Sequence, residues 1–490
     1  MSDSERRCVR SSESISDWKR RFLIGWTRGF FLAYGIKTVL GFLSVFSSFV
    51  FLKSSRRRGR SVWLRLMRVG IDEDSVRLGL CLGFGSGLFR VAYPILRNTS
   101  NFFGRYAAFF SGCIGGLSML ADPGAGGDRR NQLALNVAVR ALESRCRRSY
   151  RRGSLRGIRW RGSSSLWTRL PTAFVSTYFA EALFQLSCFE IMLSWFYHRE
   201  RLPAFYVRWI TKMSEMPPSV LRVLKDYYFG NAVYGVRYDG LKTYCESHGL
   251  DPTRANLLEW LPKNVVHPHD PDSCTSNAFR RFRNAFLRAC SMYTPVHALP
   301  VLIWKRDRVL RDPTTEIGRV VVSIGRSSFF LGAFVAIVHA SICFWRNRFR
   351  FDESSGVVLG CFLCGTSVFF ERKTRRLDLA LYVVPMALQS FWRRLRQRGV
   401  VPFEVPFFDV ILYAVSLGTI AQTMETDADC VRPSLRTLFG WLFGCGGRDV
   451  RSRCLSKEKS IGEEEEAKTP VNLSTITRIG PTRRGAVVVG

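Results

Sequence analysis

The sequence predicts an all-α, multi-spanning membrane protein with two pseudo-repeated, Gly-rich helix bundles and a helical central region. Apolar runs recur along the chain, and 47% of its residues are hydrophobic, with 38 Phe and 12 Trp. The 73 Lys and Arg outnumber the 39 Asp and Glu, which gives a formal charge of +34. Apolar segments in lipid, with basic side chains at the headgroups, account for both observations.

A 16-residue stretch that occurs twice is the third observation. Arg129–Ser144 (RRNQLALNVAVRALES) and Arg375–Ser390 (RRLDLALYVVPMALQS) align without a gap and share nine residues. Each copy follows an apolar, Gly-rich stretch that ends in an acidic residue, Asp122 or Glu371. Many membrane bundles are built by such internal duplication.

A nucleic-acid binder is the alternative that a strongly basic chain raises. The Arg clusters here punctuate apolar stretches instead of forming one basic domain, and the sequence has no RNA- or DNA-binding motif. We therefore expect membrane lipids as partners, and no nucleic acid.

The first membrane bundle is expected at 22–197, after a polar N-terminal tail at 1–21. Its first apolar run, Gly29–Leu52, is interrupted only by Lys37 and exceeds the ~20 residues that a helix needs to cross a bilayer. Further apolar runs follow at 78–96, 106–121 and 173–197.

Two polar segments interrupt this bundle. Asn131–Leu142 is expected to be an amphipathic helix, because Leu133, Val137 and Ala141 repeat at four-residue spacing. The stretch Arg145–Arg169 is dense in Arg, Ser and Gly and predicts an exposed loop.

Two carboxylates, Glu181 and Glu190, lie in the last apolar run of the first bundle. Nine residues correspond to about half a turn out of phase, so we expect them on opposite faces, as a poor catalytic pair. A carboxylate inside a membrane segment is a functional candidate, and the alternative is a Glu that reaches the interface on a tilted helix.

Apolar runs recur in the second half of the chain, as they do in the first. Residues 198–315 are expected to form an amphipathic helical region on or beside the membrane, and 316–428 the second membrane bundle, with apolar runs at 328–345, 356–370, 377–392 and 407–424. The polar tail at 429–490 includes the acidic run Glu463–Glu466 and is expected to be largely disordered.

Small residues at four-residue spacing occur in both halves. On a helix, residues four apart share a face and let another backbone approach closely, which packs membrane helices. The predicted packing residues are Gly79, Gly83, Gly87, Gly112, Gly116, Gly356 and Gly360.

The 14 Cys are scattered, which is typical of reduced thiols, and the apolar setting of Cys361-x-x-Cys364 favours buried packing over redox chemistry. A zinc site is a candidate in the central region, because Cys-x-x-His is followed by His-x-His. The spacing between these pairs matches no recognised zinc finger, so we expect no cofactor. The candidate ligands are Cys245, His248, His267, His269 and Cys274.

His267 and Asp272 have the HxxxxD spacing of glycerolipid acyltransferases, in which His acts as the base on an acceptor hydroxyl. The segment is a Pro-rich turn without a phosphate-binding motif, so a turn between helices is the favoured interpretation.

The repeat places an Arg pair before each amphipathic helix, Arg129–Arg130 and Arg375–Arg376. Anchoring at lipid headgroups is the favoured role, and recognition of a lipid or anionic substrate at the repeat interface is the alternative.

The central stretch also carries a family resemblance. Its motifs are His267-Pro268, Ser273-Cys274, AFRRF at 278–282, YTPVHALP at 293–300 and RSSFF at 326–330. With the Gly-rich segment and RRxxLAL present twice, residues 75–425 resemble the transmembrane protein 135 family. Each half is similar to the four-helix unit of the mitochondrial Tim translocases and of a small peroxisomal membrane protein. The Arg-rich insert at 145–170 and the acidic tail depart from the family.

The resemblance implies a non-enzymatic integral protein of the peroxisomal membrane, or alternatively of the mitochondrial membrane, that supports organelle dynamics and lipid homeostasis. Organelle-division or peroxisome-assembly proteins are the implied partners, and a homo-oligomer is a further expected assembly. The family provides no catalytic residue to carry over, so we expect no enzyme.

Two other functions remain open. A channel or carrier predicts a polar route formed by Arg90, Arg140, Glu181 or their partners in the second half. A membrane acyltransferase rests on His267 and Asp272. The repeat itself duplicates a way of packing and anchoring a helix, so function is expected where the copies differ or in the segment between them.

Overall fold

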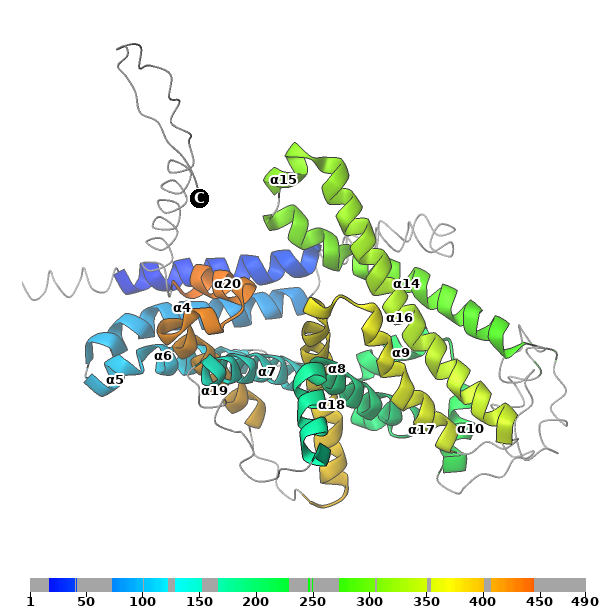
Figure 1. Cartoon of the computed structure of the whole chain (residues 1–490). Coiled ribbons are helices and arrows are strands. Elements are labelled where there is room, and N and C mark those ends of the chain that lie inside the picture. The colour runs from blue at the N-terminus through cyan, green and yellow to red at the C-terminus, as the bar shows by residue number, and fades with distance from the viewer. Residues whose placement is uncertain are drawn as a thin grey trace, which may run out of the picture.

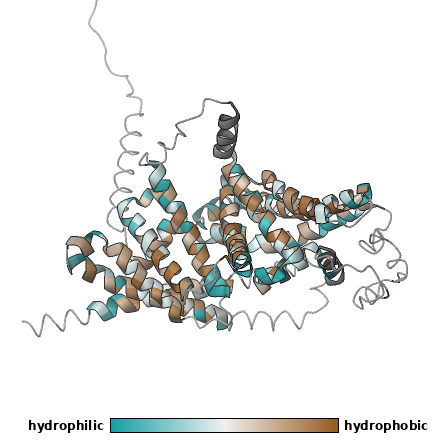
Figure 2. Cartoon of the chain, turned by 90° about the horizontal axis from the view of Figure 1, so that it is seen from below, coloured by the Kyte–Doolittle hydropathy of each residue, from teal (hydrophilic) through white to brown (hydrophobic). Residues whose placement is uncertain are grey.

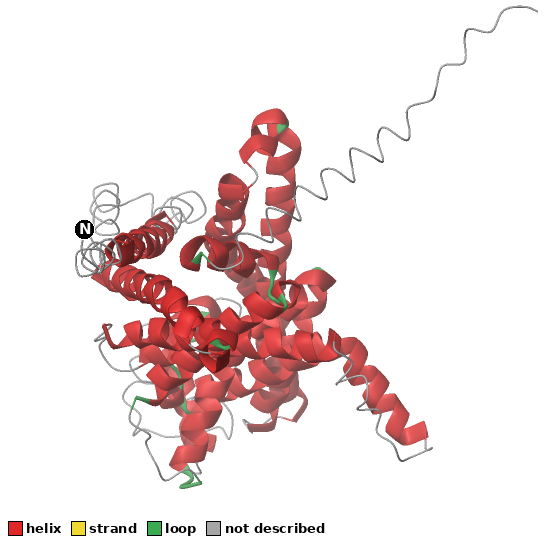
Figure 3. Cartoon of the chain, turned by 90° about the vertical axis from the view of Figure 1, so that its left-hand side faces the viewer, coloured by secondary structure: helices red, strands yellow, loops and turns green. Residues whose placement is uncertain are grey.

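Almost all the described residues of the computed structural model are helical, short loops join the helices, and no strand occurs among these residues (Figure 3). The described residues are 17–39, 41, 73–99, 101–121, 128–151, 166–228, 246, 249, 273–304, 306–349, 354–400 and 407–444. Within them, three helices are long and apolar enough to cross a membrane, at Ser75–Thr99, Tyr178–Tyr197 and Pro313–Phe349. This is compatible with an integral membrane protein and confirms the all-α class.

The N-terminal part contains a helix over 17–39 followed by the elements α4 (Glu73–Thr99), α5 (Asn101–Arg105), α6 (Ala107–Gly116), η1 (Leu117–Ala121) and α7 (Asp128–Arg151). The middle of the chain forms α8 (Leu166–Tyr197), η2 (Arg199–Arg201), α9 (Ala204–Ser214), α10 (Pro218–Tyr228), α14 (Cys274–Trp304) and α15 (Arg306–Arg311). The C-terminal part forms α16 (Pro313–Phe349), α17 (Ser354–Leu363), η3 (Cys364–Phe370), α18 (Lys373–Gln397), α19 (Phe408–Thr426), η4 (Ala428–Cys430) and α20 (Pro433–Phe443).

The packing does not follow chain order (Figure 1). Helix α8 lies within 22–197 but packs against α18, η3 and α17, while α19 returns from the C-terminal part to pack against α6 and α7. Two groups of helices result. The α4 group contains α4, α6, α7, α19 and α20, and the α16 group contains α8, α9, α14, α16, α17 and α18.

Each group has its own hydrophobic core. Phe89, Met119 and Leu417 are buried in the core of the α4 group. Trp195 and Phe196 are fully buried in the core of the α16 group. Hydrophobic residues run along the helices of both groups, interleaved with hydrophilic ones (Figure 2). Van der Waals contact between these closely packed faces helps to hold the helices together.

All seven predicted packing glycines lie against a neighbouring helix or side chain. A Cβ atom at Gly79, Gly83 or Gly87 would lie 2.8–2.9 Å from atoms of the helix over 17–39. A Cβ atom at Gly112 would lie 2.5 Å from Gly418 Cα, and Gly116 is equally close to α19, at Ala414. Gly356 and Gly360 face α16, at Trp345 and Val338. No methyl group fits at these positions unless the neighbour moves.

Several helix boundaries differ from the sequence prediction. The helix that enters the first apolar run is already present at residue 17, twelve residues before Gly29, and the end of that run lies outside the described residues. The loop predicted from Arg145 is wrong at its start, because α7 continues to Arg151. Its last turns are held by ion pairs from Arg147 to Glu143 and from Arg148 to Asp427, which a count of Arg, Ser and Gly does not reveal.

Candidate functional site

A cavity of about 970 Å³ lies inside the α16 group. Helices α8, α9, α14, α16 and α18 form its walls, and α7 and the start of α20 reach it from the α4 group. Its volume is at the upper end of the ~300–1,000 Å³ that ligand pockets occupy. Two of the wall helices, α8 and α16, contain candidate membrane spans.

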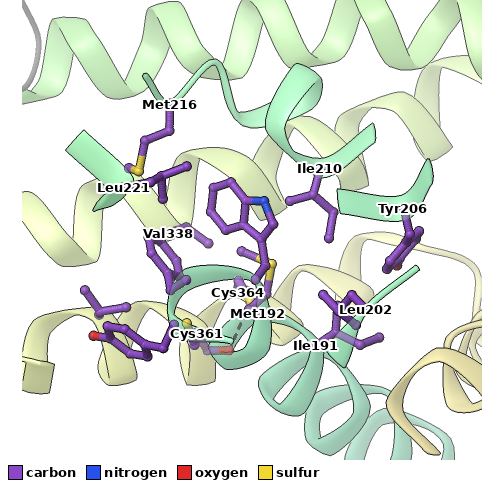
Figure 4. Close-up of a cluster of buried hydrophobic side chains, with 14 of the residues drawn as sticks. Ile191, Met192, Leu202, Tyr206, Ile210, Met216, Leu221, Val338, Cys361 and Cys364 are labelled. Carbon is purple, nitrogen blue, oxygen red and sulfur yellow. Dashed lines mark hydrogen bonds between the residues drawn. The ribbon is translucent and has the colours of Figure 1, made fainter. Parts of the chain in front are cut away.

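Most of the cavity wall is apolar. Met192, Ile210 and Met216 belong both to the wall and to the core around Trp195. Figure 4 shows their side chains, with those of Tyr206 and Val338, turned toward a common interior. The wall is therefore continuous with a well-packed core, as expected for a preformed pocket.

Tyr382 is an exposed residue of the cavity wall. It leaves 64% of its surface uncovered. The protein atoms around its hydroxyl desolvate it and raise its pKa.

One end of the cavity is polar. Arg140 from α7, Arg375 and Asp378 from α18, and Arg432 at the start of α20 all line it. The Arg140 Nη1 atom lies 3.9 Å from Asp378 Oδ1, and Arg432 forms an ion pair with the same carboxylate. This end thus joins the two helix groups through charged side chains.

Glu143 organises the guanidinium groups at this end. It accepts hydrogen bonds from Arg432 Nε at 2.6 Å, Arg147 Nη2 at 2.8 Å and Arg140 Nη1 at 3.0 Å. Burial alone would raise the pKa of Glu143, but the hydrogen bonds from Arg432 and Arg140 lower it below its ordinary value. Glu143 is therefore a carboxylate that fixes the orientation of two cavity-lining Arg side chains.

Arg375 is held by a second network. Its Nη1 atom lies 3.1 Å from Glu371 Oε1, 3.2 Å from Ser327 Oγ and 3.2 Å from His297 Nε2. Burial and the charge of Arg375 lower the pKa of His297 to about 4. His297 is consequently neutral near pH 7, and its Nε2 atom can accept the hydrogen bond that Arg375 donates.

Arg130 and Arg376, the second Arg of each copy, are partly buried and bind buried carboxylates. Arg130 Nε binds Asp409 of α19 at 2.7 Å, and Arg376 Nη1 binds Glu181 of α8 at 2.8 Å. The carboxylate in each pair is at most 9% exposed. The second Arg of each copy thus fixes a helix that packs out of chain order. Headgroup contact by Arg129, Arg130, Arg375 and Arg376 stays a prediction.

Glu181 and Glu190 both bind α18, although we expected them on opposite faces. Glu190 forms an ion pair with Arg394 and accepts a hydrogen bond from Ser390 Oγ at 2.9 Å. Arg376 near the start of α18 reaches Glu181, and Arg394 near its end reaches Glu190. The position of each Glu around its own helix therefore did not determine which helix it binds.

The residues proposed for a polar channel have separate partners. Arg90 donates hydrogen bonds to the Leu442 carbonyl at 2.6 Å and the Trp441 carbonyl at 2.8 Å. Glu181 is paired with Arg376, and of the three residues only Arg140 lines the cavity. The structure does not bring Arg90, Arg140 and Glu181 into one route.

Most of the predicted zinc ligands lie outside the described residues, namely Cys245, His248, His267 and His269, together with Asp272 of the HxxxxD pattern. Cys274 begins α14 and accepts a hydrogen bond from Asn347 Nδ2 at 3.1 Å. Across the described ranges, no group of three or more His, Cys, Asp or Glu is arranged to hold a metal ion.

Cys361 and Cys364 are both fully buried, as their apolar setting predicted. The Cys364 thiol donates to the Cys361 carbonyl at 3.1 Å. This places the pair in the core between α8 and α16, where it contributes to packing.

Sequence reasoning missed Glu143, Asp378, Tyr382 and Arg432 as site residues. A signal was present in the repeat, because Glu143 and Asp378 align with Gln389 and Gln132 of the other copy. Gln132 and Gln389 hydrogen-bond to each other. The two acidic residues and the two Gln residues thus occupy matched positions of the repeat, and of these four residues only Asp378 lines the cavity.

The chain matches no protein-family model, no curated protein and no solved structure with which it was compared.

Proposed function

We propose that this protein is a non-enzymatic integral membrane protein that binds a lipid in the cavity of the α16 group. The observation that carries the proposal is the large apolar cavity between two helices that can cross a membrane. The apolar wall complements the hydrocarbon chains of a lipid, which can pack against it by van der Waals contact.

The resemblance to the transmembrane protein 135 family supports a role in lipid homeostasis and organelle dynamics in the peroxisomal or mitochondrial membrane. The two Arg–carboxylate pairs support the two-unit architecture of that family. Arg130 and Arg376 are equivalent in the repeat. Arg130, in the first copy, binds α19, which follows the second copy in the chain, and Arg376, in the second copy, binds α8, which follows the first copy. We infer that two copies of one helical unit have exchanged a helix.

A lipid carrier is the second candidate function. Carriers often place their substrate site at the interface of two repeats. Arg140 and Arg432 from the α4 group meet Asp378 from the α16 group at the polar end of the cavity, which supports this arrangement.

Lipid binding can be tested by filling the cavity. The double variant Met292→Trp/Val296→Trp adds bulk to two wall positions on α14. Its matched control is Val321→Trp/Val322→Trp, at exposed positions on α16 that do not line the cavity. Full-length proteins purified from the same cells would be extracted, and their bound lipid measured by mass spectrometry.

We expect the control to retain the lipid of the wild type and the filled variant to lose most of it. Equal lipid content in all three proteins, each still monodisperse, would refute the proposal. Transfer of the bound lipid between vesicles by reconstituted protein distinguishes a carrier from a static binder. Imaging of tagged protein with peroxisomal and mitochondrial markers tests the membrane assignment.

A further inference from the structure

A buried tyrosine hydroxyl in the cavity wall has no hydrogen-bond partner. Tyr206 of α9 is only 9% exposed, and its side chain is turned toward the same interior as those of Met192 and Ile210 (Figure 4). Its ring stacks on that of Trp209, with the two centroids 5.5 Å apart. Among the described residues, none forms a hydrogen bond with the Tyr206 hydroxyl. A buried hydroxyl without a partner is rare and costly, so it indicates a polar atom of a ligand.

Other buried polar groups of the same wall do have partners. Trp195 Nε1 donates to Thr211 Oγ1 at 3.1 Å, and His339 Nε2 lies 3.1 Å from the Ser214 carbonyl oxygen. Ser214 Oγ donates to the Thr211 carbonyl oxygen at 3.2 Å. The lack of a partner at Tyr206 is thus not a general property of the wall.

Two further tyrosine hydroxyls share this condition. Tyr293 of α14 and Tyr382 of α18 line the cavity, and neither hydroxyl is hydrogen-bonded to a described residue. Burial raises the pKa of Tyr206 well above its ordinary value, and the charges of Cys188, Tyr382 and Tyr293 raise it further. Such charge effects require that the hydroxyls lie near one another. The cavity therefore gathers three neutral O–H donors from three helices.

The charges of the wall are balanced within the protein. The charged side chains that line the cavity, among the described residues, are all in ion pairs, Arg140 and Arg432 with Glu143, Asp378 with Arg432, and Arg375 with Glu371. A charged head group would find no unpaired counter-charge there, and burial of an unpaired charge is costly. The cavity thus favours an uncharged ligand that has a large apolar part and atoms that accept hydrogen bonds.

We propose that the cavity binds the carbonyl oxygens of an uncharged lipid, an acylglycerol or a prenylquinone, through the hydroxyls of Tyr206, Tyr293 and Tyr382. A carbonyl oxygen accepts two hydrogen bonds and donates none, so it complements phenol donors. Both lipid classes join more than one carbonyl group to long hydrocarbon chains. This inference rests on the proposed lipid-binding function and adds the chemistry of the head group.

The test compares an ester lipid with a matched ether. Radiolabelled dioleoylglycerol is bound to immobilised full-length protein in detergent. Dioleoylglycerol, its dioleyl ether analogue or a short-chain prenylquinone is then used as competitor. The ether retains the chains and the free hydroxyl but lacks both carbonyl groups. We expect it to compete on the order of tenfold more weakly than dioleoylglycerol, because it leaves the phenol donors unpaired.

Variants locate the carbonyl contact. Tyr206→Phe/Tyr293→Phe removes two hydroxyls and keeps both rings, so it should weaken dioleoylglycerol binding about tenfold and leave binding of the ether unchanged. The matched control is Tyr413→Phe, because the Tyr413 side chain is 5% exposed in the core of the α4 group and does not line the cavity. Without ligand, the double variant should unfold at or above the wild-type temperature, because the hydroxyls that it loses had no partner.

The outcomes separate this inference from lipid binding itself. Loss of the ester preference in the double variant, and its retention in Tyr413→Phe, supports carbonyl recognition. Equal competition by ester and ether in the wild type, or an ester preference that survives in the double variant, would overturn it. A prenylquinone that competes more strongly than dioleoylglycerol, and only while the two hydroxyls are present, would assign the carbonyls to a quinone.

Binding of none of these lipids also overturns the inference. If Met292→Trp/Val296→Trp nevertheless loses the lipid that copurifies with the wild type, lipid binding stands and only the head-group chemistry fails. If that variant retains the lipid of the wild type, both proposals fail.

Discussion

Substitution of Gly112 by Ala tests the closest contact between helices that are distant in sequence. The added Cβ atom would lie 2.5 Å from Gly418 Cα and 3.0 Å from the Leu417 carbonyl oxygen. Ordinary contacts of a Cβ atom begin at 3.4 Å, so α6 and α19 must separate by about 1 Å. The opposing atoms are backbone and cannot rotate away. Overpacking of this kind costs about 1–3 kcal/mol.

Gly325→Ala on α16 is the matched control, because nothing lies within 4 Å of its added Cβ atom. Removal of a Gly from a helix interior stabilises by about 0.5–1 kcal/mol. Thermal unfolding of both variants in one detergent should therefore shift in opposite directions, downward for Gly112→Ala and unchanged or upward for Gly325→Ala. If Gly112→Ala unfolds at or above the wild-type temperature, the close approach of α6 and α19 is refuted.

Three further predictions use buried charges and thiols. Arg376→Gln leaves Glu181 buried without its cation and should lower the free energy of unfolding by ~3–5 kcal/mol. The double variant Arg376→Gln/Glu181→Gln should recover much of this loss in thermal unfolding. A double variant that is no more stable than Arg376→Gln would contradict the ion pair. The pKa of His297 is about 4 in the folded protein, whereas its ordinary value is 6.5. As the pH drops below 6.5, His297 therefore becomes protonated in the unfolded chain but stays neutral in the folded protein. The free energy of unfolding should consequently fall between pH 6.5 and pH 4. His297→Gln should flatten this fall in pH-dependent unfolding, and an unchanged slope would count against the buried neutral imidazole. Among the described thiols, the exposed Cys146 should react with maleimide in the folded protein, while Cys361 stays unreactive until denaturant is added. Peptide mass spectrometry measures the two reactions, and faster labelling of Cys361 than of Cys146 would contradict the prediction.

Local sequence patterns were sufficient for the helical class and for many of the helices. Apolar runs and four-residue periodicity depend on neighbours along one helix, and they located α4, α7 and α18. They could not show that α8 and α19 pack away from their sequence neighbours. That choice depends on complementary surfaces, such as Gly112 against Gly418, and on ion pairs such as Arg130 with Asp409.

The cavity was beyond sequence reasoning for a related reason. Its wall comes from seven helices, and its polar end joins Arg140, Asp378 and Arg432, which are remote along the chain. The repeat nevertheless contained part of the answer. Function was expected where the copies differ, and Arg140, which aligns with Met386, lines the cavity.

The out-of-order packing of α19 sets the timing of biogenesis. Arg130 and Asp409 are separated by 279 residues, so their ion pair cannot form until most of the chain has been synthesised. At roughly 5–20 residues per second, the ribosome needs about 14–56 s to cover that distance. During this interval the glycine face of α6 and the charge of Arg130 have no native partner. The nascent first half must therefore be shielded, by lipid or by an insertion factor, until its completing helix emerges.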